Sequence, residues 1–109
     1  MKIYLAGPMR GIPNLNREAF VPWARRLREA GFTVFSPAER EEDEPQTADF
    51  LAEARVKGSP SRLAMSEELA WICIEADAVA LMPGWEKSKG SIAEKAVAEA
   101  LGLEVIYLA

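Results

Sequence analysis

The sequence predicts an α/β domain with a four-stranded parallel sheet. Short apolar runs of strand length alternate with segments in which apolar residues recur at helical spacing. Glycine or proline closes most of these elements. This alternation is typical of parallel sheets joined by right-handed crossovers. The 109 residues are enough for one domain, so we expect a single domain over residues 1–109.

The first strand and the first helix come early in the chain. Residues 3–6 form an apolar run closed by a Gly-Pro pair, which predicts a buried strand. The helix that follows is predicted to end at Gly31, which suits the position after a helix C-terminus. Pro22 conflicts with an unbroken helix from Asn16, so we expect a kink or a helix that begins near Pro22. The predicted core-facing residues are Phe20, Trp23, Ala24, Leu27 and Ala30.

The middle of the chain holds the second strand and the second helix. The strand is predicted over residues 32–35 and ends at a Ser-Pro pair. Residues 39–59 are acidic and poor in apolar side chains, apart from a weak helical pattern near residue 50, and they predict a long surface excursion. Ser59 and Pro60 then match the cap and the first residue of a helix. The predicted core stripe of this helix is Met65, Leu69, Ile72, Cys73 and Ala76.

The C-terminal part repeats the pattern. A third strand is predicted over residues 77–82, and a last helix ends at Gly102 before a fourth strand over residues 104–108. Cys73 has apolar neighbours on both sides, so it is expected to be a buried structural thiol. The predicted core-facing residues of the last helix are Ile92, Ala93, Ala96, Val97, Ala100 and Leu101.

These elements together predict a three-layer, flavodoxin-like (Rossmann-like) fold with strand order 2-1-3-4. In such sheets, ligands bind beyond the carboxyl ends of the strands, at the point where the strand order reverses. That point lies between loops 7–11 and 84–91. Both loops are rich in glycine, and they carry cations and hydroxyls. We therefore expect the functional site where these two loops meet.

Composition excludes several classes of protein. Thirteen basic residues against 17 acidic residues give a net charge of −4, which argues against binding to duplex nucleic acid. No apolar run is long enough for a membrane helix or a signal sequence, and one cysteine cannot form an intrachain disulfide, so a cytoplasmic location is predicted. The sequence has no histidine, which removes Ser-His pairs and His-ligated zinc. We expect neither a cofactor nor a metal.

The two loops carry groups suited to an anion. Standard dinucleotide and P-loop fingerprints are absent from the sequence. Ser88, Gly90 and Ser91 nevertheless lead directly into a helix N-terminus, where free amides and the helix dipole favour a phosphate. Arg10 adds donors from the facing loop.

Glu94 has two interpretations from the residues alone. Ser91-x-x-Glu94 matches a capping box, in which the glutamate binds the cap amide. Alternatively, Glu94 is a catalytic carboxylate facing the loop. Tyr4 is read as a half-buried strand residue, Glu68 as a surface glutamate, and Trp85 as either a lid over a base or a dimer contact.

Several motifs together resemble a known family. They comprise residues 3–11, 35–39, 69–73 and 76–91 with Glu94, and they cover nearly all of the chain except residues 40–59. In these motifs the chain resembles small phage and prophage proteins of the nucleoside 2-deoxyribosyltransferase-like superfamily. The Pro-Gly-Trp-Glu-x-Ser-x-Gly block is specific to that phage-type family, and its link to characterised enzymes is more distant.

The resemblance implies a role for each site residue. It makes Glu94 the nucleophile on C1′ of a nucleoside and places Tyr4 beside it. Ser88, Gly90 and Glu94 reproduce the Ser-x-Gly-x-x-x-Glu spacing of 2′-deoxynucleoside 5′-phosphate N-hydrolases. In the transferases an aspartate stands at the serine position. Superfamily members usually carry an aspartate on the helix before the third strand, where this chain has Glu68 as the proton-donor candidate.

The resemblance also assigns the first loop. Arg10 matches an arginine in the hydrolase Tyr-x-x-Gly-x-x-Arg-Gly segment, and Gly7, Met9 and Gly11 complete the predicted substrate loop. The implied reaction is release of the base from a (deoxy)nucleoside 5′-monophosphate through a glycosyl-Glu94 intermediate. The alternatives are a nucleoside deoxyribosyltransferase, an NAD-type glycohydrolase and a non-catalytic nucleotide sensor. Related sites are completed by a second subunit, so a homodimer or higher homo-oligomer is implied.

Overall fold

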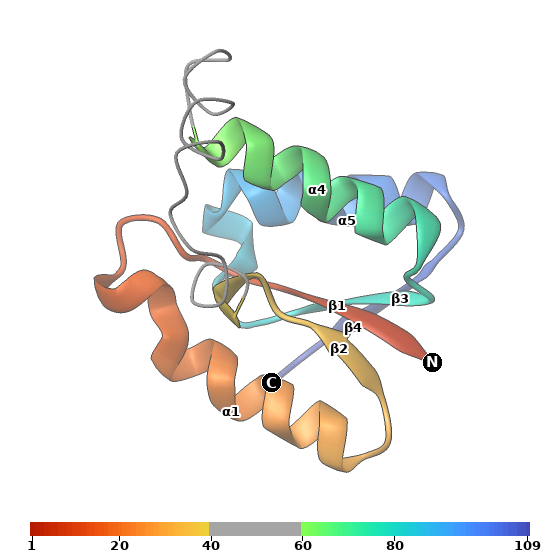
Figure 1. Ribbon diagram of the computed structural model, residues 1–109, viewed down its shortest axis with the longest axis horizontal. Helices are drawn as coiled ribbons and strands as arrows, with labels where there is room; N and C mark the ends of the chain where they lie inside the picture. Colours follow the sequence, from red (N-terminus) through yellow and green to blue (C-terminus); the bar gives the residue numbers. More distant parts are fainter. Residues whose placement is uncertain (40–59) are drawn as a thin grey trace.

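A computed structural model describes residues 1–39 and 60–109, and its centre is a four-stranded sheet. The strands are β1 (Lys2–Ala6), β2 (Thr33–Phe35), β3 (Ala78–Leu81) and β4 (Glu104–Tyr107). All three pairings are parallel, and the order is β2-β1-β3-β4 (Figure 1). The predicted α/β class and strand order are therefore confirmed.

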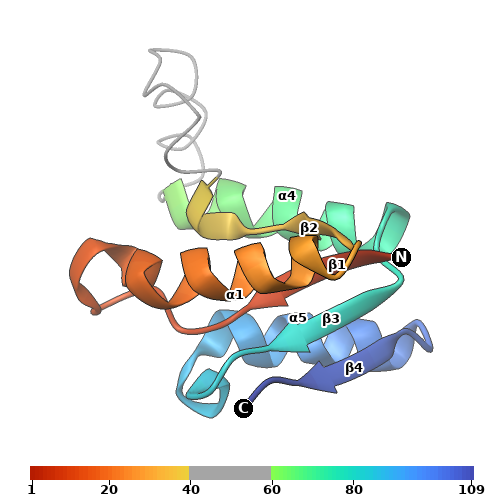
Figure 2. The same cartoon turned by 90° about the horizontal axis from the view of Figure 1, so that it is seen from below.

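Helices cover both faces of the sheet and complete three layers. Helix α1 (Arg17–Glu29) lies on one face, and α4 (Pro60–Ile74) and α5 (Lys89–Ala100) lie together on the other (Figures 1 and 2). Two short 3-10 turns, η1 (Pro13–Asn16) and η2 (Trp85–Lys87), sit in the loops that follow β1 and β3. Both turns therefore lie at the end of the sheet where the strand order reverses between β1 and β3.

The strands bury side chains on both faces, as expected when helices cover a parallel sheet. Ile3 and Leu5 face α1, whereas Tyr4 and Ala6 face α4 and α5. Burial of a large apolar side chain such as Ile3 or Leu5 stabilises the fold by roughly 1.5–3 kcal/mol. Alternation along β1 therefore places the one tyrosine of this strand in the α4–α5 layer.

Helix α1 begins at Arg17 and includes Pro22, so the alternative of a helix that begins near Pro22 was wrong. Proline at this position removes the bond to the carbonyl of Glu18. Burial of Phe20 and Ala24 against the sheet offsets that loss. The predicted end is confirmed, because Gly31 has a φ of +99° and its amide donates to the Arg28 carbonyl at 2.9 Å.

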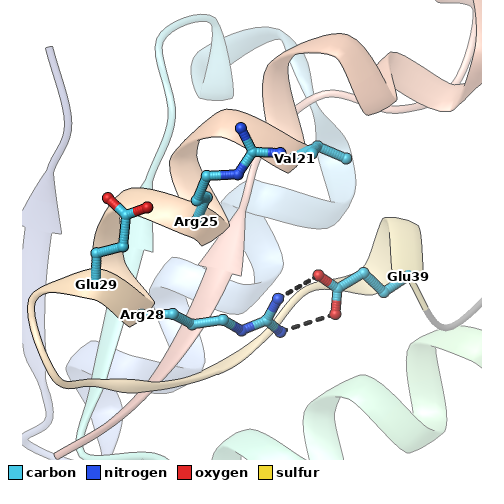
Figure 3. Close-up of a pocket in the computed structure, with 5 residues that line it drawn as sticks. All are labelled: Val21, Arg25, Arg28, Glu29 and Glu39. Carbon is cyan, nitrogen blue, oxygen red and sulfur yellow. Dashed lines mark hydrogen bonds and ion pairs between the residues drawn. The ribbon is translucent and has the colours of Figure 1, made fainter.

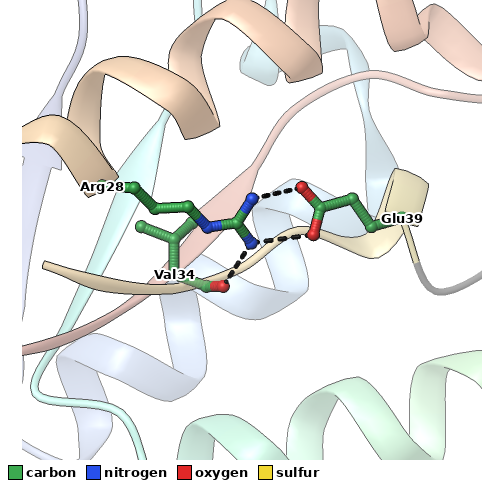
Figure 4. A network of polar contacts seen from close by, with 3 residues as sticks. All are labelled: Arg28, Val34 and Glu39. Atoms are coloured by element: carbon green, nitrogen blue, oxygen red, sulfur yellow. Dashed lines mark hydrogen bonds and ion pairs between the residues drawn. The ribbon is translucent and has the colours of Figure 1, made fainter.

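Arg28 ties α1 to the end of β2. Its guanidinium binds both carboxylate oxygens of Glu39 and donates to the Val34 carbonyl at 2.8 Å (Figure 4). Beside it is a surface hollow of about 410 Å³ (Figure 3), whose lining residues are Val21, Arg25, Arg28, Glu29 and Glu39. The ion pair is partly exposed, so we assign it a modest structural role.

The second helix begins at Pro60, as predicted, but one of its core assignments was wrong. Cys73 is exposed, whereas Ile72 beside it is fully buried. Neighbouring residues on a helix point about 100° apart, so both cannot face the sheet. The excursion over residues 40–59, its helical pattern and the Ser59 cap lie outside the described residues. Among residues 1–39 and 60–109, no helix is long and apolar enough to cross a membrane.

Candidate active site

The start of α5 differs from the capping box predicted from the sequence. Ser88, in an extended conformation, is the N-cap, and its Oγ accepts a bond from the Ser91 amide at 3.1 Å. The cap therefore lies three residues earlier than predicted, and Glu94 falls in the second turn of the helix. Its carboxylate is too far along the helix to serve as the cap partner, and it binds another group.

Glu94 binds the hydroxyl of Tyr4. The Tyr4 hydroxyl donates to Oε2 of Glu94 in a buried hydrogen bond. Tyr4 is fully buried, rather than half-buried as predicted, and Glu94 is only 4% exposed. Ser91, Glu94 and Ala98 are the buried residues of α5, and their spacing defines the helix face that packs on the sheet. The predicted core-facing set was partly wrong, because Ile92, Ala96, Ala100 and Leu101 are exposed. The structure thus brings two of the predicted catalytic residues together.

Glu68 joins this pair from α4. It is half-buried and interacts electrostatically and by hydrogen bonding with both Glu94 and Tyr4. Burial raises the pKa of Glu94, the Tyr4 hydroxyl lowers it, and the charge and hydrogen bond of Glu68 raise it, to about 8 overall. Burial and the two carboxylates raise the pKa of Tyr4 well above its usual value.

Two carboxyl groups can share a hydrogen bond only when one of them holds a proton. The pKa of Glu94, raised to about 8, therefore favours the protonated form of Glu94 beside the Glu68 carboxyl at neutral pH. Near neutral pH, the pair carries one proton and one negative charge. Such a pair contains a carboxylic acid and a carboxylate side by side, which is the pairing that acid-assisted nucleophilic chemistry requires.

Two further aromatic rings pack with Tyr4. Phe35 stacks on Tyr4 with ring centroids 5.4 Å apart, and Trp71 lies 5.1 Å from Phe35. Sequence reasoning missed both rings as site residues. Their signals were available, because Phe35 ends β2 level with Tyr4 and Trp71 follows Glu68 at helical spacing. Tyr4, Phe35 and Trp71 belong to the same apolar cluster between the sheet and the α4–α5 layer.

The two predicted loops lie side by side. A Cβ placed on Gly84 would lie 3.5 Å from Cγ of Pro8, so the chain segments after β3 and β1 are in contact. A Cβ on Gly7 would lie 3.1 Å from Cβ of Met82, which gives Gly7 a packing role. The side-chain amide of Asn16 donates to the Pro8 carbonyl at 2.9 Å and holds the first loop against the start of α1.

The remaining predicted residues have varied surroundings. Arg10 is exposed, and it makes no hydrogen bond or ion pair within the described part of the chain. Gly11 is exposed with a φ of +76°, and Met9 packs against the core on the α1 face. The Trp85 ring packs 6.0 Å from the Tyr107 ring and 5.5 Å from Lys95 Nζ, so its role as a lid stays a prediction.

No group of three or more potential metal-ligating side chains occurs among residues 1–39 and 60–109. The candidate site combines a carboxyl pair, a tyrosine hydroxyl and the N-terminus of α5.

The proton shared by this pair should make stability depend on pH. The pKa of Glu94 is raised from 4.5 to about 8, so folding favours its protonated form. The resulting stabilisation of the folded state is fully present below about pH 4.5 and is lost as the pH rises towards about 8. Each unit of difference between the folded and unfolded pKa corresponds to about 1.4 kcal/mol. Denaturant unfolding should show wild-type stability falling over this range and Glu94→Gln stability falling less.

Glu99→Gln is the matched control for this measurement. Glu99 lies on the same helix, is exposed, and pairs with Lys95 at 2.9 Å on the surface. It should follow the wild-type pH dependence, since an exposed ion pair contributes little. Identical pH slopes for wild type and Glu94→Gln would contradict the assignment of the buried proton.

Comparison with known proteins locates the chain in one family. A search of curated proteins gives no match. The family described as "Domain of unknown function (DUF4406)" matches residues 1–107, which include the whole sheet, both loops and the Tyr4–Glu68–Glu94 cluster. Because the match spans nearly the entire chain, the protein belongs to the DUF4406 family.

Proposed function

We propose that the protein cleaves the N-glycosidic bond of a (deoxy)nucleoside 5′-monophosphate and releases the free base. The observation that carries this proposal is the buried Glu94 carboxyl, bound by the Tyr4 hydroxyl and paired with Glu68. A nucleophile must be ionised and a general acid must be protonated. The raised pKa of Glu94 places the shared proton on Glu94 at neutral pH. The pair meets both needs once this proton moves across the shared hydrogen bond to Glu68 and leaves Glu94 ionised.

The first step joins the sugar to Glu94. Tyr4 binds Oε2 of Glu94, and once Glu68 holds the shared proton, Oε1 of the Glu94 carboxylate attacks C1′ from the side opposite the base. The C1′–Oε1 bond forms as the C1′–N bond breaks, and the electron pair of that bond goes to the base. The proton of the Glu68 carboxyl passes to the departing base nitrogen. Proton delivery of this kind accelerates such reactions by about 10²–10⁴.

The second step returns the enzyme to its starting state. A water molecule attacks C1′ while the Glu68 carboxylate takes one of its protons. The C1′–Oε1 bond breaks, and its electron pair restores the Glu94 carboxylate. Glu68 is protonated again, so the pair regains its single proton. Two inversions at C1′ retain the configuration, as in retaining glycosidases.

The N-terminus of α5 supports binding of the 5′-phosphate. Its free amides and its dipole favour an anion, and Ser88 and Gly90 stand in the first turn. A Cβ added to Gly90 would lie 3.3 Å from the terminal methyl group of Met65. This methyl group is the end of a flexible side chain. The phosphate would lie about one helical turn from Glu94, a span that fits C1′ and the 5′-phosphate of one nucleotide.

Exposed apolar side chains support the implied self-association. Ile74 of α4 is 77% exposed, and Ile92 of α5 is 46% exposed. Leu101, directly after α5, is 50% exposed. A second subunit that covers these helices would border the same layer that holds Glu94.

Glu94→Gln tests the nucleophile. Glutamine keeps the size of the side chain but cannot form the glycosyl ester, so base release should fall by at least about 10³-fold while the fold and nucleotide binding persist. The assay is chromatography of free base after incubation with the common nucleosides and their 5′-monophosphates. A 2-fluoro substrate should leave a sugar ester on Glu94 that mass spectrometry detects.

The exposed Glu99→Gln protein is the control and should turn over normally. Wild-type turnover by a folded Glu94→Gln protein would exclude the covalent mechanism. Nucleotide binding by the wild type without any base release would instead identify a sensor.

Arg10→Ala tests the phosphate contact. Arg10 is exposed on the loop after β1, which contacts the segment after β3 through Pro8 and Gly84, so its removal should not unfold the protein. Loss of a charge-assisted hydrogen bond costs about 1.5–3 kcal/mol, which is roughly 10- to 150-fold in affinity. Calorimetry should show this loss for monophosphates and little change for nucleosides. Equal losses for both ligands would contradict a phosphate role for Arg10.

A further inference from the structure

Ser91 carries a buried hydroxyl that the proposed chemistry does not use. The residue is 1% exposed, and its Oγ has no hydrogen-bond partner among the described residues. It belongs to the first turn of α5, on the same buried face as Glu94 and Ala98. Most buried hydroxyls in proteins are paired, so an unpaired one beside a candidate active site indicates a missing ligand.

Local geometry explains why the protein does not satisfy this hydroxyl itself. A helical serine often donates to the carbonyl four residues earlier, which here belongs to Lys87. Lys87 precedes the N-cap, and Ser88 is extended with φ −104° and ψ 113°, so that carbonyl lies outside the helical ladder. Ser88 Oγ already binds the Ser91 amide and leaves the Ser91 hydroxyl unused.

The position of Ser91 corresponds to the middle of the substrate. Along α5, Ser88 lies at the phosphate end, Glu94 lies at C1′, and Ser91 lies between them on the Glu94 face. Glu94 must approach C1′ from the side of the furanose opposite the base. The 3′-hydroxyl projects on that same side, between C1′ and the 5′-phosphate. A serine hydroxyl can both donate to and accept from such a group.

We propose that the buried hydroxyl of Ser91 binds the 3′-hydroxyl of the substrate sugar, so that the site selects nucleotides that keep this group. The inference rests on the proposed function and extends it to sugar recognition. Met65 of α4 lies over the start of α5 and approaches within 3.3 Å of the Cβ position at Gly90. Its unbranched side chain can rotate away and give the sugar access to Ser91.

Ser91→Ala and a matched control test this assignment. Ser36→Ala is the control, because Ser36 is 4% exposed and its Oγ also lacks a partner among the described residues, but it follows β2 instead of lying on α5. All proteins carry Glu94→Gln so that ligands are not consumed. Calorimetry compares the four 2′-deoxynucleoside 5′-monophosphates with their 2′,3′-dideoxy counterparts and with the ribonucleotides.

Ser91→Ala should weaken 2′-deoxynucleotide and ribonucleotide binding about tenfold and change dideoxynucleotide binding less than about twofold. Ser36→Ala should leave all affinities unchanged. Both variants should melt at or above the parent temperature, because each loses an unpaired buried hydroxyl.

Equal losses for deoxy and dideoxy ligands, or a loss confined to ribonucleotides, would overturn the 3′-hydroxyl assignment while the proposed function stands. Binding of none of these nucleotides by the parent protein would overturn the proposed function and the inference with it.

Discussion

Burial of one carboxyl group is the constraint on which the site depends. Removing Glu94 from water disfavours its charged form, and nearby Glu68 adds to that penalty. The Tyr4 hydroxyl acts in the opposite direction by stabilising the charge on Glu94. A shared proton is the arrangement that satisfies all three groups at neutral pH. In the proposed mechanism, the same arrangement supplies the nucleophile and the acid.

The fold delivers these three groups from three different elements. Strand β1 lies at the centre of the sheet and points Tyr4 into the α4–α5 layer. Helix α5 turns Glu94 towards that strand because Ser88 caps the helix early and places Glu94 in its second turn. Helix α4 contributes Glu68. The geometry of the Tyr4–Glu68–Glu94 cluster therefore depends on how β1, α4 and α5 pack together, and not on the conformation of a loop.

Much of this arrangement could be predicted from the sequence, for identifiable reasons. Apolar periodicity predicted the strands and helices, and their alternation predicted a parallel sheet. The flavodoxin-like strand order then identified the two loops at the switch point. The cap was misplaced because Ser88 and Ser91 are both favourable N-cap residues, and the glutamate three residues after Ser91 favoured the later one. Cys73 was misassigned because apolar neighbours do not specify a helix face. The distance between Glu68 and Glu94 depends on how two helices pack, which no local pattern encodes.

Titration of the Glu94 carboxyl by carbon-13 NMR is the most direct test of the shared proton. Glutamate labelled at Cδ would give one resonance that is absent from the Glu94→Gln protein and therefore belongs to Glu94. The account predicts an apparent pKa of about 8 for this resonance, and a further increase in Tyr4→Phe, which lacks the stabilising hydroxyl. A Glu94 resonance that titrates near 4.5 in the folded protein would contradict the account.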